Sequence, residues 1–408
     1  MKKVAIIGAG PAGMMAALTA ADHGAEVALF DTNEEVGRKL ALAGGTRCNI
    51  THLGSAKELA SHYHEAERFL LSSLVRFDGN RLREFFRLRL GLATVSESDG
   101  RVFPEIQSGA QVAERFRSIL VEAGVKLMLG RRIHTLTPVA DGLAVDDELF
   151  DAVVLGTGGA SYPATGSDGW GFSAASALGH QITPLLPGLS GLQVDEAWPK
   201  QLSGVRLDQA ELKLVSKSIR PNPCTAGELL FTHFGLSGPA ALNLSRWVAK
   251  SIDNNRRADL LLDLIPQLNH EQLTARLVSQ IDHSPKSQIK TIIKTLVPET
   301  LAAAVCIQTK IDPARPAGSV KRTDLINLAD FLKRAPLTIT KLRPLTAAKV
   351  TVGGVQLREV NPKTMASKLI RGLYFAGEIL DIDGQSGGYN LQAAFSTGFT
   401  AGTNAALD

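Results

Sequence analysis

The first thirty-one residues constrain the fold of this chain more than any other stretch. An apolar run at 4–7 leads into a glycine-rich turn at 8–13, Gly-Ala-Gly-Pro-Ala-Gly, which is followed by an alanine-rich segment and a second apolar run at 27–30. Asp31 stands directly after that second run. The order predicts a strand, a tight turn, a helix and a second strand, which together open a dinucleotide-binding unit.

The residues of this turn suit the binding of a pyrophosphate. Gly8 lets the chain turn away from the strand, Gly10 lets the backbone approach the phosphates, and Gly13 lets the helix pack closely on the sheet. The first turn of the helix presents unpaired N–H groups and the positive end of the helix dipole. An acid about 20 residues beyond the turn is placed to accept hydrogen bonds from a ribose. The residues predicted to contact the dinucleotide here are Gly8, Gly10, Pro11, Ala12, Gly13 and Asp31.

Two further glycine-rich loops follow predicted strands and extend the same site. The first covers 37–51, where Arg38 or Lys39 supplies positive charge for a phosphate and Asn49 supplies an amide. The second closes the apolar run 153–155 with Gly-Thr-Gly-Gly, which lets backbone amides approach the cofactor again. The residues predicted to bind the cofactor in these loops are Arg38, Lys39, Gly45, Thr46, Arg47, Cys48, Asn49, Thr157, Gly158 and Gly159.

Composition places the chain among ordinary globular proteins. With 408 residues, of which 44% are hydrophobic and 21% charged, it is long enough for two or three domains. No apolar run of about 18 residues is present, so no membrane span is predicted. The start Met1-Lys2-Lys3 superficially fits a secretory signal, but the turn at 8–13 interrupts the apolar run that follows. Three cysteines without metal-type spacing favour a reducing, cytoplasmic compartment and argue against a disulfide frame or a metal site.

The pattern of apolar residues changes along the chain in a way that divides it. Between about 189 and 265, short β-like runs are separated by Pro and Gly. Helical patterns dominate from Glu271 to about Arg334, so the helical part of the insert is placed at about 266–345. The last part of the chain returns to strands and turns, and a closing helix begins at Tyr389. The prediction is therefore an α/β nucleotide-binding domain, formed by 1–188 and 346–408, that is split by an inserted β-rich and helical region.

Positive charge is concentrated in two places. The chain has 44 basic and 40 acidic residues, and nine of the basic residues fall in 310–349 against three acids. Four arginines lie in a second predicted helix, 78–90, which follows a predicted helical segment at 56–76. Such clusters of basic residues either form an ordinary solvated surface or bind the phosphates of a polyanion.

Several motifs together resemble one bacterial family. The chain resembles the flavoproteins labelled BaiN/RdsA-like, which are NAD(P)/FAD-dependent oxidoreductases, over almost its whole length. The elements not shared by flavoproteins generally are Arg-Cys-Asn at 47–49, Phe-Thr-His-Phe-Gly-Leu-Ser-Gly-Pro at 231–239 and Gly-Gly-Tyr-Asn at 387–390. The chain departs from the family at Thr46, where a glycine is usual, and in the loop 381–386, which differs between subgroups. Cofactor binding is expected to survive both departures, but the substrate of a characterised member does not carry over to this chain.

This resemblance implies a Rossmann-like FAD-binding domain of the two-dinucleotide-binding-domain type, split by the insert. It implies that the opening turn and Asp31 hold the ADP half of FAD. A helix N-terminus at Tyr389 would also favour the anionic reduced flavin. The residues that the resemblance assigns to the ribityl chain are Gly377 and Glu378, and those assigned to the isoalloxazine ring are Gly388, Tyr389 and Asn390, with Leu391 beside them.

The chemistry implied by the resemblance is the reduction of a conjugated C=C bond. No complete second nucleotide-binding unit is present, so NAD(P)H is expected to bind only transiently as the electron donor. We expect a hydride to reach one carbon from the flavin and a protein acid to protonate its neighbour. Cys48, Tyr389 and His233 are the candidates for this acid. Each also has a plain structural interpretation, as a buried thiol, a packed ring and a satisfied histidine respectively.

Three interpretations of the activity stay open. Characterised members of the family resemble either a reductase of steroid-like enones or a dihydrouridine synthase that acts on ribosomal RNA, and the basic stretch 310–349 favours contact with RNA. The third interpretation is a flavin redox sensor or electron carrier without an organic substrate. Rapid flavin reduction by NAD(P)H that halts without an acceptor would favour an enzyme, and an inert flavin would favour a sensor. No pattern in the sequence indicates an oligomeric state.

Overall fold

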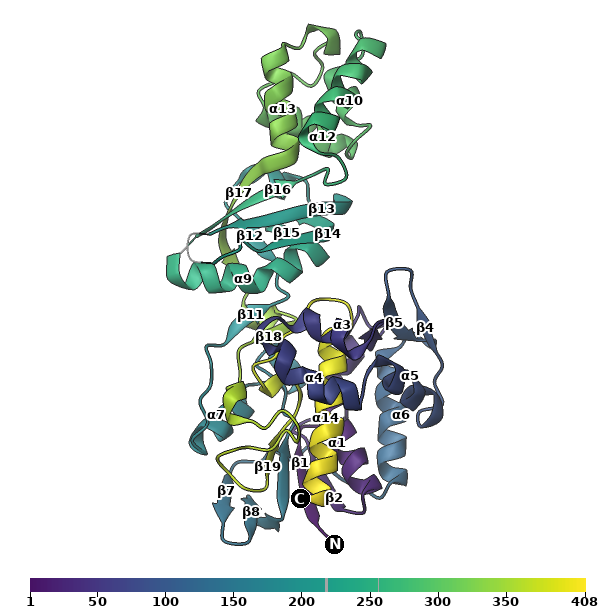
Figure 1. Cartoon of the computed structure of the whole chain (residues 1–408), viewed down its shortest axis with the longest axis vertical. Helices are drawn as coiled ribbons and strands as arrows, with labels where there is room; N and C mark the ends of the chain where they lie inside the picture. Colours follow the sequence, from purple (N-terminus) through teal and green to yellow (C-terminus); the bar gives the residue numbers. More distant parts are fainter. Residues whose placement is uncertain (217–218, 256) are drawn as a thin grey trace. The chain divides into compact units, whose positions relative to one another are not determined.

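The structure is a computed structural model of the chain. It describes residues 1–216, 219–255 and 257–408. These residues form two compact units (Figure 1). The first unit comprises 1–186 and 345–408, and the second comprises 187–344. In the described part of the chain, no helix is both long enough and apolar enough to cross a membrane.

The first unit is built on a parallel sheet. In the described residues its strand order is β19-β10-β1-β2-β6, and all neighbouring strands are parallel. β1 and β10 are almost entirely apolar and buried, as expected for central strands with helices on both faces. The predicted Rossmann-like α/β fold is thereby confirmed. The strands span Lys3–Ile7 (β1), Glu26–Phe30 (β2), Lys126–Met128 (β6), Ala152–Leu155 (β10) and Leu373–Phe375 (β19).

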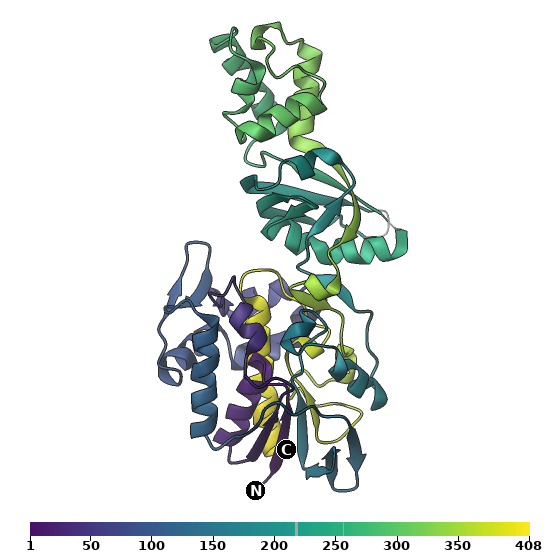
Figure 2. The same cartoon turned by 180° about the vertical axis from the view of Figure 1, so that it is seen from behind.

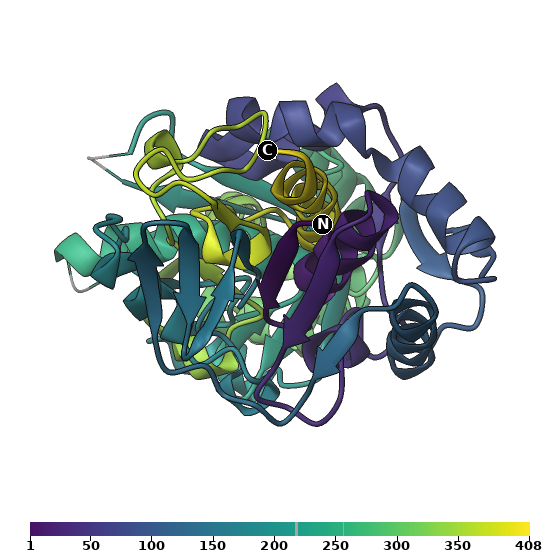
Figure 3. The ribbon, with the colours of Figure 1, turned by 90° about the horizontal axis from the view of Figure 1, so that it is seen from below.

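Small residues allow the first and last helices of the chain to pack together. α1 spans Pro11–Asp22 and α14 spans Tyr389–Leu407. Gly398 of α14 lies so close to α1 that a Cβ atom there would overlap the carbonyl oxygen of Ala12, and Gly402 repeats this approach further along the helix. The two chain ends consequently lie side by side, as the views in Figures 1 and 3 show.

Shorter elements complete the first unit. One antiparallel sheet has the order β3-β5-β4 and another the order β7-β8-β9. The sheet strands span Thr51–His52 (β3), Thr94–Ser96 (β4), Arg101–Pro104 (β5), Leu136–Val139 (β7), Gly142–Val145 (β8) and Glu148–Phe150 (β9), with Val350–Val352 (β18) nearer the C-terminus. The helices span Arg38–Leu42 (α2), Ala56–Ala60 (α3), Glu67–Arg76 (α4), Gly79–Leu88 (α5), Gly109–Glu122 (α6) and Trp170–Ala177 (α7).

A kink interrupts the segment 56–76, which the sequence pattern predicts to be helical throughout. α3 ends at Ala60, and a 3₁₀ turn at Ser61–Ala66 precedes α4. Within that turn His64 has φ 54 and ψ −123, which no helix accommodates. The prediction of an uninterrupted helix is wrong at this point, and the kink determines where the side chains of the turn lie.

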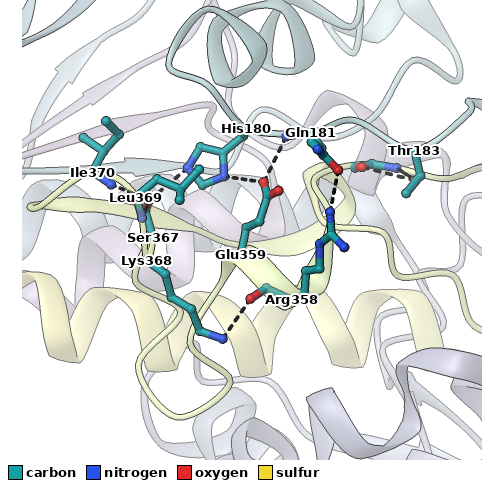
Figure 4. A network of polar contacts seen from close by, with 10 residues as sticks. His180, Gln181, Thr183, Arg358, Glu359, Ser367, Lys368, Leu369 and Ile370 are labelled. Carbon is teal, nitrogen blue, oxygen red and sulfur yellow. Dashed lines mark hydrogen bonds and ion pairs between the residues drawn. The ribbon is translucent and has the colours of Figure 1, made fainter.

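A polar network around His180 fastens the segment 357–370 to the end of α7 (Figure 4). The His180 ring contacts Glu359 Oε2 through Nδ1 at 3.2 Å and Ser367 Oγ through Nε2 at 2.8 Å. Ser367 Oγ also accepts hydrogen bonds from the N–H groups of Leu369 and Ile370. Although His180 lies between Ser367 and Glu359 in a row of hydrogen bonds, as in a hydrolase triad, its side chain is fully buried. The network is therefore a structural clamp.

The second unit is a closed barrel (Figures 1 and 2). The helices within 270–334 gather at one end of it, whereas the helix Pro239–Asn255 packs along its strands. The strand order is β12-β15-β14-β13-β16-β17, and the unit has a hydrophobic core of its own. Its strands span Leu192–Val194 (β12), Arg206–Val215 (β13), Cys224–Thr232 (β14), Gly235–Ser237 (β15), Ala258–Asp263 (β16) and Ala335–Leu342 (β17), and Leu186–Gly188 (β11) precedes them. Its helices span Ala197–Gln201 (α8), Pro239–Asn255 (α9), His270–His283 (α10), Ile289–Ile293 (α11), Glu299–Gln308 (α12) and Arg322–Arg334 (α13).

The helical part of the insert ends earlier than the predicted limit of 345. α13 ends at Arg334, and the next residue begins β17, which pairs with β16 and β12 and closes the barrel. Alternate residues of this strand, from Ala335 to Ile339, are buried, which is the period of a half-buried strand. The predicted helical part, 266–345, therefore includes a strand at 335–342, although the helical pattern itself ends at about Arg334, as α13 does. The predicted limits of the whole insert, 189 and 345, lie within two residues of the compact unit 187–344.

Candidate active site

The glycine turn after β1 is tightly packed except at one position. Gly8 has φ 105, and a Cβ atom there would lie 2.5 Å from the carbonyl oxygen of Gly156. A Cβ atom at Gly13 would overlap the carbonyl oxygen of Gly8. Beside Gly10, in contrast, no atom lies within 4 Å of the Cβ position. No side chain caps the start of α1, so the turn offers free space next to unpaired N–H groups, as a pyrophosphate requires.

Asp31 braces this turn from the end of β2. One carboxylate oxygen accepts a hydrogen bond from the N–H of Ala9 at 2.6 Å, and the other accepts from the N–H and the side-chain amide of Asn33, both at 2.8 Å. A carboxylate has about four acceptor positions, so Asp31 retains capacity for a ribose hydroxyl. Its assignment to the ADP half of FAD stays a prediction.

Lys39 and Glu378, both predicted to contact the cofactor, bind each other. The Lys39 ammonium lies 2.7 Å from Glu378 Oε2 and 2.7 Å from Ser161 Oγ. The other oxygen of Glu378 accepts from the N–H of Thr351 at 2.8 Å. Burial acts to raise the pKa of Glu378, but the Lys39 charge and these hydrogen bonds outweigh it and lower that pKa. The charge of Lys39 is therefore compensated inside the protein, and the exposed Arg38 is the better source of charge for a phosphate.

The loop at 44–49 holds two residues in left-handed backbone conformations. Thr46 has φ 73 and Cys48 has φ 64, a region in which side chains are strained. This geometry suits glycine, which is the residue that the resemblance to the BaiN/RdsA-like family implies for the position of Thr46. Cys48 is fully buried, and burial raises the pKa of its thiol to about 12. The geometry of Cys48 thus suits packing better than proton transfer.

Three buried polar atoms in these loops have no hydrogen-bond partner among the described residues. They are Nε of Arg47, Oδ1 of Asn49 and Oγ1 of Thr157. Buried polar atoms are nearly always bonded, and the two unpaired oxygens, which lie in two predicted cofactor loops, fit a ligand that supplies donors. Gly45 adds open space, since no atom lies within 4 Å of its Cβ position. The residues present are therefore compatible with a bound dinucleotide.

Other predicted contacts turn out to hold the framework together. The Arg47 guanidinium lies 4.0 Å from the ring centroid of Phe103 and pairs with Glu97, which ties it to the β4–β5 hairpin. Gly377 donates its N–H to Thr397 at 2.9 Å. Asn390 binds Gly384 through both its amide atoms, at 2.9 Å each, and so fixes the loop before α14. The other predicted loop residues are Gly158 and Gly159, at the end of β10, and Gly388 and Leu391, at the start of α14.

Tyr389 stands at the centre of an aromatic cluster that the sequence does not reveal. Its ring stacks on His62, with centroids 4.2 Å apart and planes at 18°, and on His52, at 5.2 Å and 15°. Tyr63 lies edge-on to the ring and donates its hydroxyl to the carbonyl oxygen of Tyr389 at 2.7 Å. Burial and the charge of Asp99 raise the pKa of Tyr389 to about 12. The Tyr389 hydroxyl itself has no hydrogen-bond partner among the described residues.

Glycines provide the signal from which this cluster could have been found. A Cβ atom at Gly387 would lie 3.1 Å from the Tyr389 ring, and one at Gly384 would lie 2.9 Å from Tyr389 Cβ. A Cβ atom at Gly100 would overlap the His52 ring. Three glycines in two distant loops therefore leave room for rings whose identity the local sequence does not give.

His233, the third candidate acid, does not belong to this cluster. It lies in the second unit, in the turn between β14 and β15, and its exposed ring is edge-on to Phe234 at 5.1 Å. The cluster around Tyr389 is formed by the first unit alone. The structure therefore assigns Tyr389 and His233 to separate units.

Several of the basic residues predicted to face a polyanion have partners inside the protein. Lys333 lies 2.6 Å from Asp263 and also donates to carbonyl oxygens of the α10 entry loop. Arg315 donates to Ser319. In the arginine-rich helix α5 and after it, Arg83 donates to Thr94 and Arg89 pairs with Asp22. The arginine group thus serves mainly the local fold, and the basic stretch 310–349 offers fewer free charges than its composition indicates.

Comparison with known proteins places this site in a wider context. The family model described as "HI0933-like protein Rossmann domain" matches residues 2–404. The chain is 31% identical to the 3-dehydro-bile acid delta(4,6)-reductase of Clostridium scindens, over 100% of this chain and 99% of that protein. It is 29% identical to the ribosomal RNA dihydrouridine synthase of Haemophilus influenzae, over 97% and 96%. Among solved structures, 3-ketosteroid delta1-dehydrogenase from Sterolibacterium denitrificans has the same fold, with a TM-score of 0.53, 14% identity and full coverage of both chains.

Proposed function

The chain belongs to the family of HI0933-like proteins with a Rossmann domain, and we propose that it is an FAD-dependent oxidoreductase that reduces a C=C bond conjugated to a carbonyl group. The resemblance to BaiN/RdsA-like flavoproteins is thus confirmed. Relatives along the whole chain are named as a bile acid delta(4,6)-reductase and as ribosomal RNA dihydrouridine synthases. Both names describe the saturation of a C=C bond, which is the common ground for the proposal.

The observation that carries the cofactor assignment is the free space beside Gly10 in an otherwise closed turn. The turn and Asp31 would hold the ADP half, and Asn49 and Thr157 would offer their unpaired oxygens to donors of the cofactor. FAD, when bound, supplies the hydride for the reaction. NAD(P)H is the proposed source of the electrons that restore the reduced cofactor.

Tyr389 is the proposed acid. Its pKa of about 12 keeps the hydroxyl protonated at neutral pH, and the described residues leave that hydroxyl without a partner. The hydride adds to the carbon β to the carbonyl group, the π electrons move to the α carbon, and Tyr389 protonates that carbon. The resulting tyrosinate regains a proton from solvent. Cys48 is a weaker candidate because its thiol is fully buried.

The first candidate substrate is uridine in ribosomal RNA, reduced to dihydrouridine. Dihydrouridine synthases that are 29% and 28% identical to the chain support it, and so does the surplus of positive charge in 310–349. A small enone-type metabolite is the second candidate, supported by the 31% identical bile acid reductase. The proposal includes a cytoplasmic location, because all three cysteines are free thiols.

The first experiment measures dihydrouridine in ribosomal RNA from cells with and without this gene. We expect loss on deletion, restored by the intact gene but not by a Gly10→Val variant. Gly10 has φ −79, so valine fits the backbone and blocks only the free space. The matched control is Gly13→Val, which collides with Gly8 and should prevent folding itself.

Three outcomes would redirect or contradict the proposal. Unchanged dihydrouridine would move it to a small conjugated substrate, which an anaerobic screen of enones against the reduced enzyme would identify. A flavin inert to both NADH and NADPH would favour the non-catalytic redox sensor or electron carrier. A Gly10→Val protein that retained FAD fully would contradict the cofactor assignment.

The contact with RNA has its own test. Lys321 and Arg322 are exposed at the start of α13 and have no acidic partner among the described residues, unlike Lys333. Reversing both to Glu should weaken RNA binding, more strongly at low salt, and leave the FAD content unchanged. Reversing the internally paired Arg89 is the control for general loss of charge. Unaltered RNA affinity in the double variant would contradict this surface.

A further inference from the structure

We propose that Nε2 of His62 accepts a hydrogen bond from an N–H group of the substrate ring, so that the site recognises a cyclic imide such as uracil. The inference rests on the proposed function, because the resemblance alone puts Tyr389 beside the flavin ring. It goes further by assigning a residue that distinguishes the two candidate substrates. His62 has had no place in the mechanism so far.

The kink after α3 turns His62 toward Tyr389. In the turn Ser61–Ala66, the backbone angles of Tyr63 and His64 depart from helical values, and the His62 ring stacks on Tyr389 at 4.2 Å. Tyr63, the next residue, donates its hydroxyl to the carbonyl oxygen of Tyr389 and so ties the turn to the start of α14. The position of His62 is therefore fixed from two sides, next to the proposed proton donor.

Hydrogen bonding defines the free edge of the His62 ring. Its Nδ1 lies 2.8 Å from Oε1 of Gln385, and an amide oxygen can only accept, so Nδ1 carries the hydrogen. In a neutral imidazole the other nitrogen is then an acceptor. The described residues offer Nε2 no donor, and the side chain is only half-buried. Nε2 is thus a fixed, accessible acceptor.

His52 provides an internal contrast. It stacks on the same tyrosine, but its Nδ1 lies 2.9 Å from the carbonyl oxygen of Leu53 and its Nε2 lies 2.9 Å from that of Asp99. Both edges of this ring are occupied by the protein. Of the two histidines, only His62 can bind a substrate without breaking an existing contact.

The chemistry of the two substrates differs at this point. A uracil ring has an N–H between two carbonyl groups, conjugated to the C=C bond that is reduced, and single bases are recognised by stacking and by hydrogen bonds along this edge. A steroid-like enone presents only carbonyl oxygens, which are acceptors like Nε2. Binding it would leave Nε2 desolvated and unpaired, which is costly. The hydrogen bond transfers no proton and leaves the reduction step unchanged.

The test compares two ligands and three proteins. The oxidised, FAD-loaded enzyme is titrated with uridine 5′-monophosphate and with its N3-methyl derivative, and Kd is measured by calorimetry. We expect the wild type to bind the N–H form on the order of 10- to 100-fold more tightly. His62→Phe keeps a stacking ring but removes the acceptor, so the ratio should fall to about 1. His52→Phe should change both Kd values alike and preserve the ratio.

Measuring nucleotide binding and substrate reduction together distinguishes a failure of the His62 inference from a failure of the proposed function. A His62→Phe protein that holds FAD and keeps the wild-type ratio overturns the inference, because the preference would then be steric. A wild type that binds both nucleotides equally overturns it as well. An enzyme that reduces an enone but binds neither nucleotide overturns the inference while leaving the proposed function intact. If the enzyme reduces neither uridine nor an enone, the proposed function and the inference both fail.

Discussion

The His180 network and the Tyr389 cluster both bring histidines together with residues that are distant in sequence, but they differ in whether their hydrogen-bonding groups have partners in the protein. In the network every nitrogen of the buried ring has a partner, Glu359 on one side and Ser367 on the other. In the cluster the Tyr389 hydroxyl and one edge of His62 have none among the described residues. A closed set of hydrogen bonds stabilises a fold, whereas unused donors and acceptors on fixed rings are available to a ligand.

The largest effect that this comparison predicts is on catalysis. Tyr389→Phe should lower the rate of substrate reduction by about 10²- to 10⁴-fold, because the proposed proton donor is lost while the stacked ring remains. FAD content and thermal stability should stay close to wild type. The measurement is single-turnover oxidation of the reduced enzyme by its substrate. A rate within threefold of wild type would remove Tyr389 from the mechanism.

The Lys39–Glu378 pair in the proposed cofactor site is a closed network, so breaking it should lower stability. Lys39→Met leaves the Glu378 carboxylate without its counter-charge, and breaking such a pair costs about 2–4 kcal/mol when it is mostly buried. We expect a lower free energy of unfolding of the protein without cofactor, measured in urea. The double variant Lys39→Met/Glu378→Gln removes the charge as well and should recover part of the loss. If the single and double variants are equally stable, the pair is not the source of the stability.

The clamp around His180 should matter for stability alone. Glu359→Ala leaves the Nδ1 hydrogen of His180 and the N–H of Gln181 without an acceptor, at a cost of about 1–3 kcal/mol. Substrate reduction, measured below the unfolding temperature, should be unchanged. A large loss of activity in a folded Glu359→Ala protein would show that the contrast between network and cluster is wrong.

The smallest predicted effect is a pH dependence of stability. Burial lowers the pKa of His180 below its ordinary value of 6.5, and the opposing pull of Glu359 is weaker. The unfolded chain therefore binds a proton at this residue before the folded chain does, so stability should decrease as the pH falls below 6.5. Thermal unfolding of the wild type and of His180→Phe between pH 5 and 8 tests this, because the variant should lose that part of the dependence.

Local patterns in the sequence predict the opening of the fold well. The strand, the glycine turn, α1 and Asp31 are consecutive, and their geometry follows from residue types a few positions apart. β17 is different, because its identity as a strand depends on pairing with β16 and β12, more than seventy residues earlier in the chain. The helical pattern ends at about Arg334, but nothing nearby identifies 335–342 as the strand that closes a barrel.

The site was predictable only in part, for the same reason. The start of α14 was found from its Gly-Gly-Tyr-Asn motif, but His52 and His62 reach Tyr389 from more than 300 residues away. No local pattern encodes such a contact. Lys39 was assigned to a phosphate because its charge is visible in the sequence, whereas its partner Glu378 is distant. Charges read from sequence alone therefore overstate what is left for a ligand.

The way in which the barrel closes has a consequence for how such proteins arise. β12 is the first strand of the barrel and β17 the last, and the two are bonded neighbours, with Leu192 opposite Leu342. The chain thus enters and leaves this unit at adjacent points. A segment with adjacent ends can be gained, exchanged or removed by one genetic event without rerouting its host. Joining residues 186 and 345 by a short linker would test whether the first unit folds without the barrel.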